Sequence, residues 1–308
     1  MLPLPTAVVN RLPVAWRRAR QFREVHGYRP STRSPSTFSE KVNHRVLRDR
    51  RALLVPLCDK LAMKDVAAAS GADVRIPRTY WAGADAGELA GVEVPGGWVL
   101  KPNHSTNGRV LLGTGALPAA DDLRAATAGW LDEDGHARGQ GEWAYAFARR
   151  LLLLEERVGP GDGTPADLKV FVFDGEPALV QVHDDRFGTH TKRLYRADWT
   201  PLPDQPGYPV SEPSSPPPEL DALLEAASVL AAGYDFMRVD LYVWRGEVWF
   251  GEYTPYPSSG LRRLAPAALE DELGALWRLP ARGRRRPADV LRAATRGSGR
   301  TRALRDRA

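Results

Sequence analysis

The spacing of hydrophobic residues along the chain predicts helices and strands in alternation. One stripe at helical spacing occupies residues 220–231 and consists of Leu220, Leu223, Leu224, Ala227, Leu230 and Ala231. Two further helices are predicted within residues 36–70, the first opening on Ser and Thr residues suited to an N-cap and the second closed by Gly71. Residues 119–150 are expected to be mostly helical.

Short runs between these helices are typical of β-strands. The chain carries a buried strand at 98–100, an apolar strand at 151–156, and two hairpins that turn at Asp174-Gly175 and Arg245-Gly246. No internal repeat is present. Hairpins mixed with helices predict an α+β fold with mainly antiparallel sheets.

The second hairpin carries charged residues where strands rarely have them. Arg238 and Asp240 lie near its start and Glu252 near its end, although Asp is poorly represented in strands and ionised carboxylates are seldom buried without a partner. Gly246 lies midway between Asp240 and Glu252. An odd-membered loop, with Gly246 in the left-handed conformation of a G1 bulge, places the two carboxylates opposite each other on one face. A two-residue loop would place them on opposite faces.

Two interpretations of this hairpin fit its residues equally well. A hard divalent cation such as Mg2+ prefers oxygen ligands and would relieve the repulsion between facing carboxylates. Alternatively, Arg238, Asp240 and Glu252 form an ion-pair cluster at the rim of an edge hairpin.

Composition places the chain among ordinary globular proteins. Its 308 residues suffice for one large domain or two to three small ones, with 43% hydrophobic and 26% charged residues. The single cysteine, Cys58, excludes an internal disulfide and a cysteine-based zinc site, which fits a reducing cytoplasm. No apolar run is long enough to span a membrane and no signal-peptide core is present, so a cytoplasmic location is expected.

The net charge of +5 is unevenly distributed. Residues 282–308 are strongly basic, but no aromatic residue is interleaved with their arginines, so we expect a short helix around 287–295 and no nucleic-acid partner. A basic amphipathic helix at 14–25 leaves peripheral contact with an anionic surface open, beside the simpler interpretation of a solvated helix flank.

Other polar residues supply, in chain order, the parts of a nucleotide-triphosphate site. Such a site needs cations for the phosphates, a covering loop of backbone amides and carboxylates for magnesium. Lys60, Lys101, the "NHSTNG" loop, Glu155, Glu156 and Lys169 precede the charged hairpin. Neither GxxxxGK[ST] nor GxGxxG occurs, which excludes P-loop and Rossmann sites. Taken singly, Lys101 is more often a snorkelling lysine and the two glutamates a solvated strand end; only their joint order favours a nucleotide site.

The order of these blocks resembles the ATP-grasp ligases. "CDKLAMKDVAAASGADVRIPRTY" is similar to the DK-helix and strand entry of that superfamily, "WVLKPNHSTNGRVLL" to its lysine strand and phosphate-covering loop, "LLLLEERVG" to its adenine hinge and "MRVDLYVWRGEVWFGEYT" to its metal hairpin. "TFSEKVNHRVL", "DLKVFVFDGEP", "DRFGTHTKRLYRADW" and "GEYTPYPSSG" resemble the TupA-like group, named for teichuronopeptide biosynthesis. The similarity covers roughly residues 36–261.

The resemblance implies an ATP-grasp fold in which two α+β subdomains with mainly antiparallel sheets clasp ATP. It divides the chain into four segments, which are a helical N-terminal segment at 1–58, a small lid subdomain at 59–154, a large subdomain with the metal hairpin at 155–265, and a basic C-terminal helix and tail at 266–308.

The resemblance also implies roles in binding ATP. Lys60 and Lys101 would contact the phosphates. The flexible flap over them would consist of Ser105, Thr106, Asn107 and Gly108. The adenine and ribose would be held by the Glu155 carboxylate at the amino group, backbone at Glu156 and Val158, and Asp167 as a weaker candidate for the ribose hydroxyls.

The implied catalytic groups surround the hairpin. Asp240 and Glu252 would hold Mg2+, and Arg238 would stabilise the transferring phosphate. Lys169 and Arg193 would bind the γ-phosphate or an acyl phosphate. The chain departs from many relatives at Thr254, where they carry Asn, so the resemblance leaves one or two magnesium ions open. His183 and His190 lack metal-ligand spacing, which favours hydrogen-bonded surface histidines.

The expected function is that of an ATP-dependent carboxylate–amine ligase that forms an amide through an acyl phosphate. The partners would be a small carboxylate and an amine, either from cell-envelope polysaccharide or from natural-product biosynthesis, and oligomeric state is not indicated. The alternatives are a glycosyltransferase or small-molecule kinase of polysaccharide assembly, and a non-catalytic module acting through the basic tail.

Overall fold

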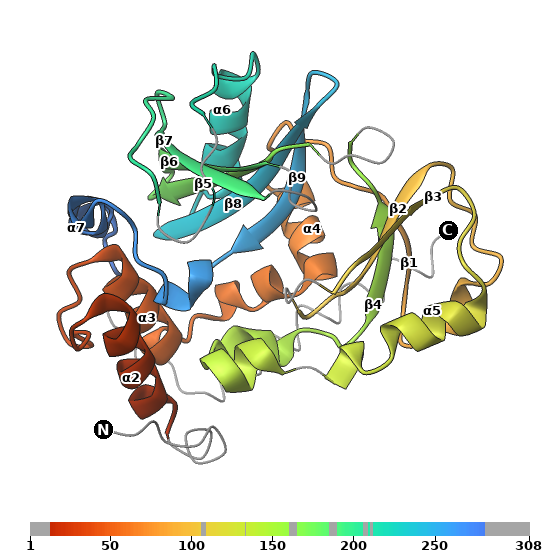
Figure 1. Cartoon of the computed structure of the whole chain (residues 1–308), viewed down its shortest axis with the longest axis horizontal. Helices are drawn as coiled ribbons and strands as arrows, with labels where there is room; N and C mark the ends of the chain where they lie inside the picture. Colours follow the sequence, from red (N-terminus) through yellow and green to blue (C-terminus); the bar gives the residue numbers. More distant parts are fainter. Residues whose placement is uncertain are drawn as a thin grey trace.

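Two antiparallel sheets form the body of the molecule (Figure 1). A computed structural model of the chain describes residues 13–105, 109–132, 134–159, 165–184, 190–205, 209 and 212–280. Within these residues the strand order is β1-β4-β2-β3 in the smaller sheet and β7-β6-β5-β8-β9 in the larger one. The strands are β1 (Thr79–Gly83), β2 (Gly97–Pro102), β3 (Leu111–Thr114), β4 (Leu152–Glu156), β5 (Asp167–Phe173), β6 (Glu176–Asp184), β7 (Thr191–Arg196), β8 (Phe236–Trp244) and β9 (Glu247–Thr254). The predicted α+β fold with antiparallel sheets is confirmed.

Helices flank both sheets, and one of them lies between the sheets (Figure 1). The α-helices are α2 (Val14–His26), α3 (Phe38–Arg48), α4 (Lys60–Ala69), α5 (Ala120–Thr127), α6 (Leu220–Leu230) and α7 (Ala267–Leu276). Short turns of helix are η1 (Ala52–Leu54), η2 (Pro56–Cys58), η3 (Ala86–Leu89), η4 (Trp130–Asp132), η5 (Gly135–Gln140), η6 (Trp143–Phe147) and η7 (Pro257–Gly260). No helix among the described residues has the length and apolar character needed to cross a membrane.

Local signals explain where the predicted helices begin and end. The Thr37 side chain accepts a hydrogen bond from the Glu40 backbone amide at the start of α3, which confirms the predicted N-cap. Gly71 has a positive φ just after α4, as a helix stop requires. Residues 119–150 are less regular than predicted, because only α5 is a regular α-helix there and η4, η5 and η6 follow it as short turns.

One of the predicted segment boundaries falls inside the strand β4. This strand spans the boundary expected between residues 154 and 155, and it pairs with β1 and β2 of the smaller sheet up to Glu156. Glu155 therefore belongs to the smaller sheet. At the C-terminus α7 packs against α3, whereas the helix predicted at 287–295 and the rest of the basic tail lie outside the described residues.

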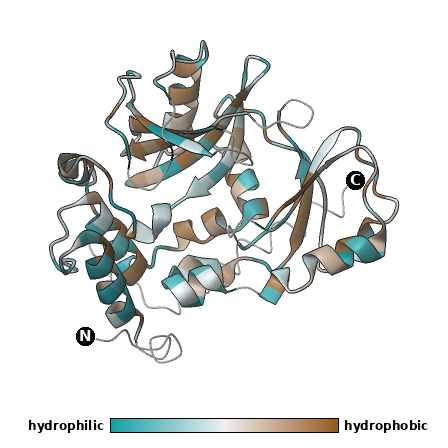
Figure 2. Cartoon of the chain, in the orientation of Figure 1, coloured by the Kyte–Doolittle hydropathy of each residue, from teal (hydrophilic) through white to brown (hydrophobic). Residues whose placement is uncertain are grey.

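The two faces of the larger sheet have different environments, and hydrophobic and hydrophilic residues both occur along its strands (Figure 2). One face packs on α6 through the predicted apolar stripe, in which Leu223, Ala227 and Leu230 are buried. The other face is aromatic near α3 and α7, where Phe171 and Phe236 are buried. Further along the same face of β5 and β8, charged residues such as Lys169 and Asp240 replace the aromatic ones. The same strands therefore carry polar side chains where they lie beside the smaller sheet.

The β8–β9 hairpin pairs Asp240 with Glu252, as predicted, but by a different geometry. The turn has only two residues, Arg245 and Gly246, both with positive φ, so the predicted odd-membered loop is wrong. The pairing shifts by one residue between Asp240 and Leu241, which leaves Gly251 as the extra residue of a β-bulge. The bulge restores the same-face arrangement that a two-residue turn would otherwise abolish.

Replacing Gly251 is expected to damage this register. A Cβ atom there would lie 2.8 Å from the Asp240 carbonyl oxygen and 2.9 Å from a ring carbon of Tyr242, and a backbone oxygen cannot move aside cheaply. We expect Gly251→Ala to lower the free energy of unfolding by about 1–3 kcal/mol, measured by urea denaturation. Gly96→Ala is the control, because a Cβ there meets nothing within 4 Å. Equal stability of the two variants would contradict a bulge that requires glycine.

Candidate active site

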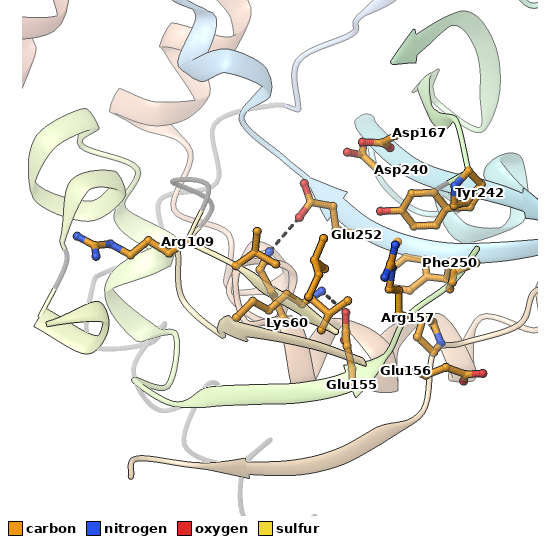
Figure 3. A pocket seen from close by; sticks show the side chains of 18 of the residues that line it. Lys60, Arg109, Glu155, Glu156, Arg157, Asp167, Asp240, Tyr242, Phe250 and Glu252 are labelled. Atoms are coloured by element: carbon orange, nitrogen blue, oxygen red, sulfur yellow. Dashed lines mark hydrogen bonds and ion pairs between the residues drawn. The ribbon is translucent and has the colours of Figure 1, made fainter. Parts of the chain in front are cut away.

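A cavity of about 390 Å³ lies between the two sheets (Figure 3). The smaller sheet contributes side chains from β2, β3 and β4, the larger sheet contributes β5, β8 and β9, and α4 contributes its first residue, Lys60. The predicted site residues that line it are Lys60, Lys101, Ser105, Glu155, Glu156, Val158, Asp167, Asp240 and Glu252. Thr106, Asn107 and Gly108 of the predicted flap lie outside the described residues. The volume is within the usual range for small-molecule sites.

Apolar side chains face each other across one part of the cavity. Val99 and Leu112 line it from the smaller sheet, and Tyr242 and Phe250 line it from the larger sheet. Two apolar walls of this kind suit a flat aromatic ring. Sequence reasoning assigned none of these four residues to the site, because an apolar residue in a strand is ordinarily part of the core.

The Glu155 carboxylate lies between two lysines. Lys101, from the neighbouring strand β2, pairs with one oxygen, and Lys64 Nζ, from α4, lies 2.8 Å from the other. Burial opposes ionisation of Glu155, but the charges of Lys101 and Lys64 outweigh burial and lower its pKa. Glu155 is therefore an ionised hydrogen-bond acceptor at the floor of the cavity. Lys64 was not among the predicted site residues; its position one helical turn after Lys60 was the available signal.

Lys60 is fixed by the start of α4. Asp59 caps this helix by accepting hydrogen bonds from the Leu61 and Ala62 amides, and Arg149 binds the same carboxylate. Lys60 Nζ donates to Glu252 Oε2 at 3.0 Å. The helix thus places one cation against the larger sheet, and Lys101 of the smaller sheet lines the same cavity.

A second charged cluster surrounds Asp240 on the larger sheet. Arg238 donates two hydrogen bonds to the Asp240 carboxylate, at 2.7 and 2.8 Å. Lys169 pairs with Asp240 and also with Asp167, the latter at 2.6 Å. Burial raises the pKa of Asp240, whereas the charges of Lys60, Lys169 and Arg238 overcome burial and hold the pKa of Glu252 well below its usual range.

These carboxylates fit a magnesium ion. Asp240 and Glu252 are direct cross-strand partners on one face and both line the cavity, so these two carboxylates would hold the ion. The described residues contain no group of three or more His, Cys, Asp or Glu side chains arranged for a metal. Thr254 accepts from Arg238 at 2.9 Å and donates to Glu252 Oε1 at 3.3 Å, so its hydroxyl serves the hairpin's own hydrogen bonds.

Three predicted catalytic residues do not line the cavity. Arg238 and Lys169 form ion pairs with Asp240, which does line the cavity. Arg193 pairs with Val182 on the face that packs toward α6, and its guanidinium lies 3.4 Å from Asp204. The adjacent Lys192 pairs with His183 on the charged face, and burial and the neighbouring Arg262 lower its pKa to about 8.

The two histidines considered in the sequence contact each other. His183 Nδ1 lies 2.7 Å from His190 Nε2, which confirms the predicted hydrogen bonding. His183 is half-buried, and burial together with nearby cations lowers its pKa to about 2. It is therefore neutral at physiological pH.

Comparison with known proteins identifies one matching family. A family model described as TupA-like ATPgrasp matches residues 40–278. No curated protein matches the sequence.

Similar solved structures include the ATP-grasp ligase PsnB complexed with a phosphomimetic variant of its minimal precursor, Mg and ADP, at 17% identity over 72% of this chain and 59% of that one, with a TM-score of 0.35. An ADP complex of purK, N5-carboxyaminoimidazole ribonucleotide synthetase, matches at 14% identity, 69% and 47% coverage and a TM-score of 0.41. D-Alanine-D-alanine ligase from Helicobacter pylori matches at 15% identity over 73% of this chain and 59% of that one, with a TM-score of 0.41. The chain spans about half to three-fifths of the length of these proteins.

Proposed function

This chain belongs to the TupA-like ATP-grasp family, and from that premise we propose that it is an ATP-dependent carboxylate–amine ligase. A carboxylate oxygen attacks the γ-phosphorus of ATP, the bond to the β,γ-bridging oxygen breaks, and an acyl phosphate and ADP form. An amine then attacks the acyl carbon, phosphate leaves, and an amide remains after the nitrogen loses a proton.

The observation that carries the proposal is the arrangement of charge around the cavity. Lys60 and Lys101 approach it from α4 and β2, and Asp240 and Glu252 approach it from the larger sheet. Lysines suit the phosphates of ATP, and the carboxylates would hold the magnesium ion that accompanies them. When bound, that ion neutralises phosphate charge. The apolar walls at Val99 and Phe250 then suit the adenine ring.

Individual roles follow from this orientation. Glu155 would accept a hydrogen bond from the adenine amino group, backbone at Glu156 and Val158 would hold the ring edge, and Asp167 would reach the ribose. Arg238 would stabilise the transferring phosphoryl group. Lys169 would act on the γ-phosphate through the Asp167 and Asp240 carboxylates, which it holds in place from outside the cavity.

We also propose how the chain divides around the site. The smaller sheet would act as the lid over the nucleotide, and its last strand would run through Glu156, because β4 belongs wholly to that sheet. The larger sheet would carry the metal and the reacting groups. The substrate pair would be an amino acid and either a sugar acid or a cell-envelope precursor, or else the partners of a natural-product amide.

Nucleotide selectivity tests the proposed function directly. A ligand that binds only the folded state at 100 times its Kd stabilises it by about 2.7 kcal/mol. We expect Mg-ATP to raise the melting temperature in differential scanning fluorimetry and UDP-sugars to leave it unchanged. Lys60→Met should abolish the shift, because it removes a phosphate cation. Stabilisation by UDP-sugars alone would instead support a glycosyltransferase.

A screen of carboxylate and amine pairs then identifies the substrates. The assay follows ADP release, and mass spectrometry of each positive mixture looks for an amide product. Phosphorylated product without an amine requirement would point to a small-molecule kinase and contradict the ligase.

A further inference from the structure

The ammonium group of Lys64 makes three polar contacts with other parts of the chain, although Lys64 lies on the helix α4. Its ammonium group lies 2.8 Å from Glu155 Oε2, 2.8 Å from the Pro77 carbonyl oxygen and 3.1 Å from Thr79 Oγ1. The ammonium group donates hydrogen bonds to Pro77 and Thr79, and its contact with Glu155 is an ion pair. The side chain is 11% exposed. Its position is therefore fixed from three directions, two of them in the segment that leads into β1.

Lys64 does not line the cavity, so any effect on a ligand must pass through Glu155. It holds one oxygen of the Glu155 carboxylate, and Lys101 holds the other. Lys101 also lines the cavity, where the proposed function assigns it to phosphate, so its charge is shared once ATP is bound. Lys64 is then the cation dedicated to Glu155.

The chemistry of Glu155 depends on this support. A carboxylate oxygen has two lone pairs. The Glu155 oxygen that accepts a hydrogen bond from Lys101 can therefore accept a second one, and the oxygen in the ion pair with Lys64 also keeps acceptor capacity. An ionised carboxylate accepts and cannot donate. Adenine presents a donor, its 6-amino group, where guanine presents an acceptor, its 6-oxo group. A fixed, ionised Glu155 therefore favours adenine and repels guanine.

We propose that Lys64 is a positioning residue that gives this enzyme its selectivity for adenine over guanine nucleotides, by fixing the Glu155 carboxylate as an acceptor at the base-binding end of the cavity. The inference rests on the proposed function, since it assumes that the base lies at Glu155. It adds a residue outside the cavity whose effect is on the choice of nucleotide rather than on the reacting groups.

Isothermal titration calorimetry with the magnesium complexes of AMPPNP and GMPPNP tests this inference in the full chain. We expect the unmodified protein to bind AMPPNP more tightly than GMPPNP. Loss of one charged hydrogen-bond partner commonly weakens an interaction about tenfold to a hundredfold. Lys64→Met should weaken AMPPNP by that amount and change GMPPNP much less, so the ratio of the two affinities falls.

Lys41→Met is the matched control. Lys41 also donates to two acceptors, the Gly274 and Trp277 carbonyl oxygens at 2.7 Å each, but it ties α3 to α7 far from the cavity. Its loss should lower the melting temperature and leave the nucleotide ratio unchanged. A purely structural role for Lys64 would give the same pattern as Lys41, which makes the ratio the decisive measurement.

Two further variants keep the inference testable. Thr79→Val retains the Lys64 charge and removes one of its acceptors, so a smaller fall in the ratio is expected; this variant decides the matter if Lys64→Met does not fold. In a Glu155→Gln background, Lys64→Met should have little further effect on the ratio, because both act through one group. An unchanged ratio in folded Lys64→Met or Thr79→Val overturns the inference alone. Failure of the unmodified protein to bind either nucleotide overturns the proposed function together with it.

Discussion

Asp240→Asn and Glu252→Gln are each expected to abolish turnover. Each substitution removes one negative charge from the proposed magnesium site and changes side-chain volume very little. Losing one preorganised electrostatic contact commonly costs ~3 kcal/mol, or about a hundredfold or more in rate. The two carboxylates are cross-strand partners on one face, so neither can replace the other at the same position.

Both variants are expected to fold. In Glu252→Gln the amide oxygen can still accept the hydrogen bond from Lys60, and in Asp240→Asn the neighbouring cations keep other partners. Without the Asp240 charge, Lys169 still pairs with Asp167 at 2.6 Å. Arg238 still lies 3.6 Å from Glu252 and donates to Thr254. A buried cation left wholly unpaired would be strongly destabilising, and this arrangement avoids that outcome.

The measurement is ADP release with the substrate pair that the screen identifies, together with urea denaturation of each variant. Glu247→Gln is the matched control, because Glu247 lies on the same strand but pairs with exposed Arg75 outside the cavity. It should retain full activity. Turnover within threefold of the unmodified protein in a folded Asp240→Asn variant would remove Asp240 from the site.

Arg238→Lys is expected to be nearly as severe despite keeping the charge. The guanidinium uses Nε and Nη2 to grip both oxygens of Asp240, and Nη2 also reaches Thr254 at 2.9 Å. A lysine ammonium lacks this planar fork and cannot hold Asp240 and a phosphoryl oxygen in the same geometry. We expect the rate to fall about a hundredfold.

Comparison of kcat with KM locates the effect of Arg238. If Arg238 acts on the transferring phosphoryl group, kcat falls while the affinity for Mg-AMPPNP changes little. Arg75→Lys serves as the control, since its exposed side chain forms an ion pair with Glu247 at the far end of the hairpin. A variant that loses nucleotide affinity and keeps kcat would show that Arg238 binds ATP instead.

The hairpin illustrates how a correct prediction can rest on an incomplete mechanism. The spacing of Asp240, Gly246 and Glu252 predicted paired carboxylates, and the register confirms the pairing. The sequence-based argument placed the extra residue at the turn, whereas it is Gly251 in the middle of β9. Both geometries give the same face, because one extra residue anywhere between the two carboxylates shifts the alternation once.

Arg193 and Lys192 show the limit of the same argument. Side chains alternate between faces along a strand, so an error of one residue moves a cation to the opposite side of the sheet. Sequence reasoning chose Arg193, but the register places Lys192 on the charged face with His183. Nothing within β7 itself identifies which face looks toward the smaller sheet, because both neighbours are cations.

The sequence by itself determined the α+β class, the family, the hairpin pairing and most of the charged residues that line the cavity. These follow from local periodicity, turn residues and the order of motifs, each of which depends only on residues that are close together in the sequence. Only the tertiary structure brought Lys64 to Glu155 and set Val99 and Leu112 opposite Tyr242 and Phe250. Those contacts join residues of separate elements, and their geometry depends on how α4 and the two sheets pack, which no local pattern encodes.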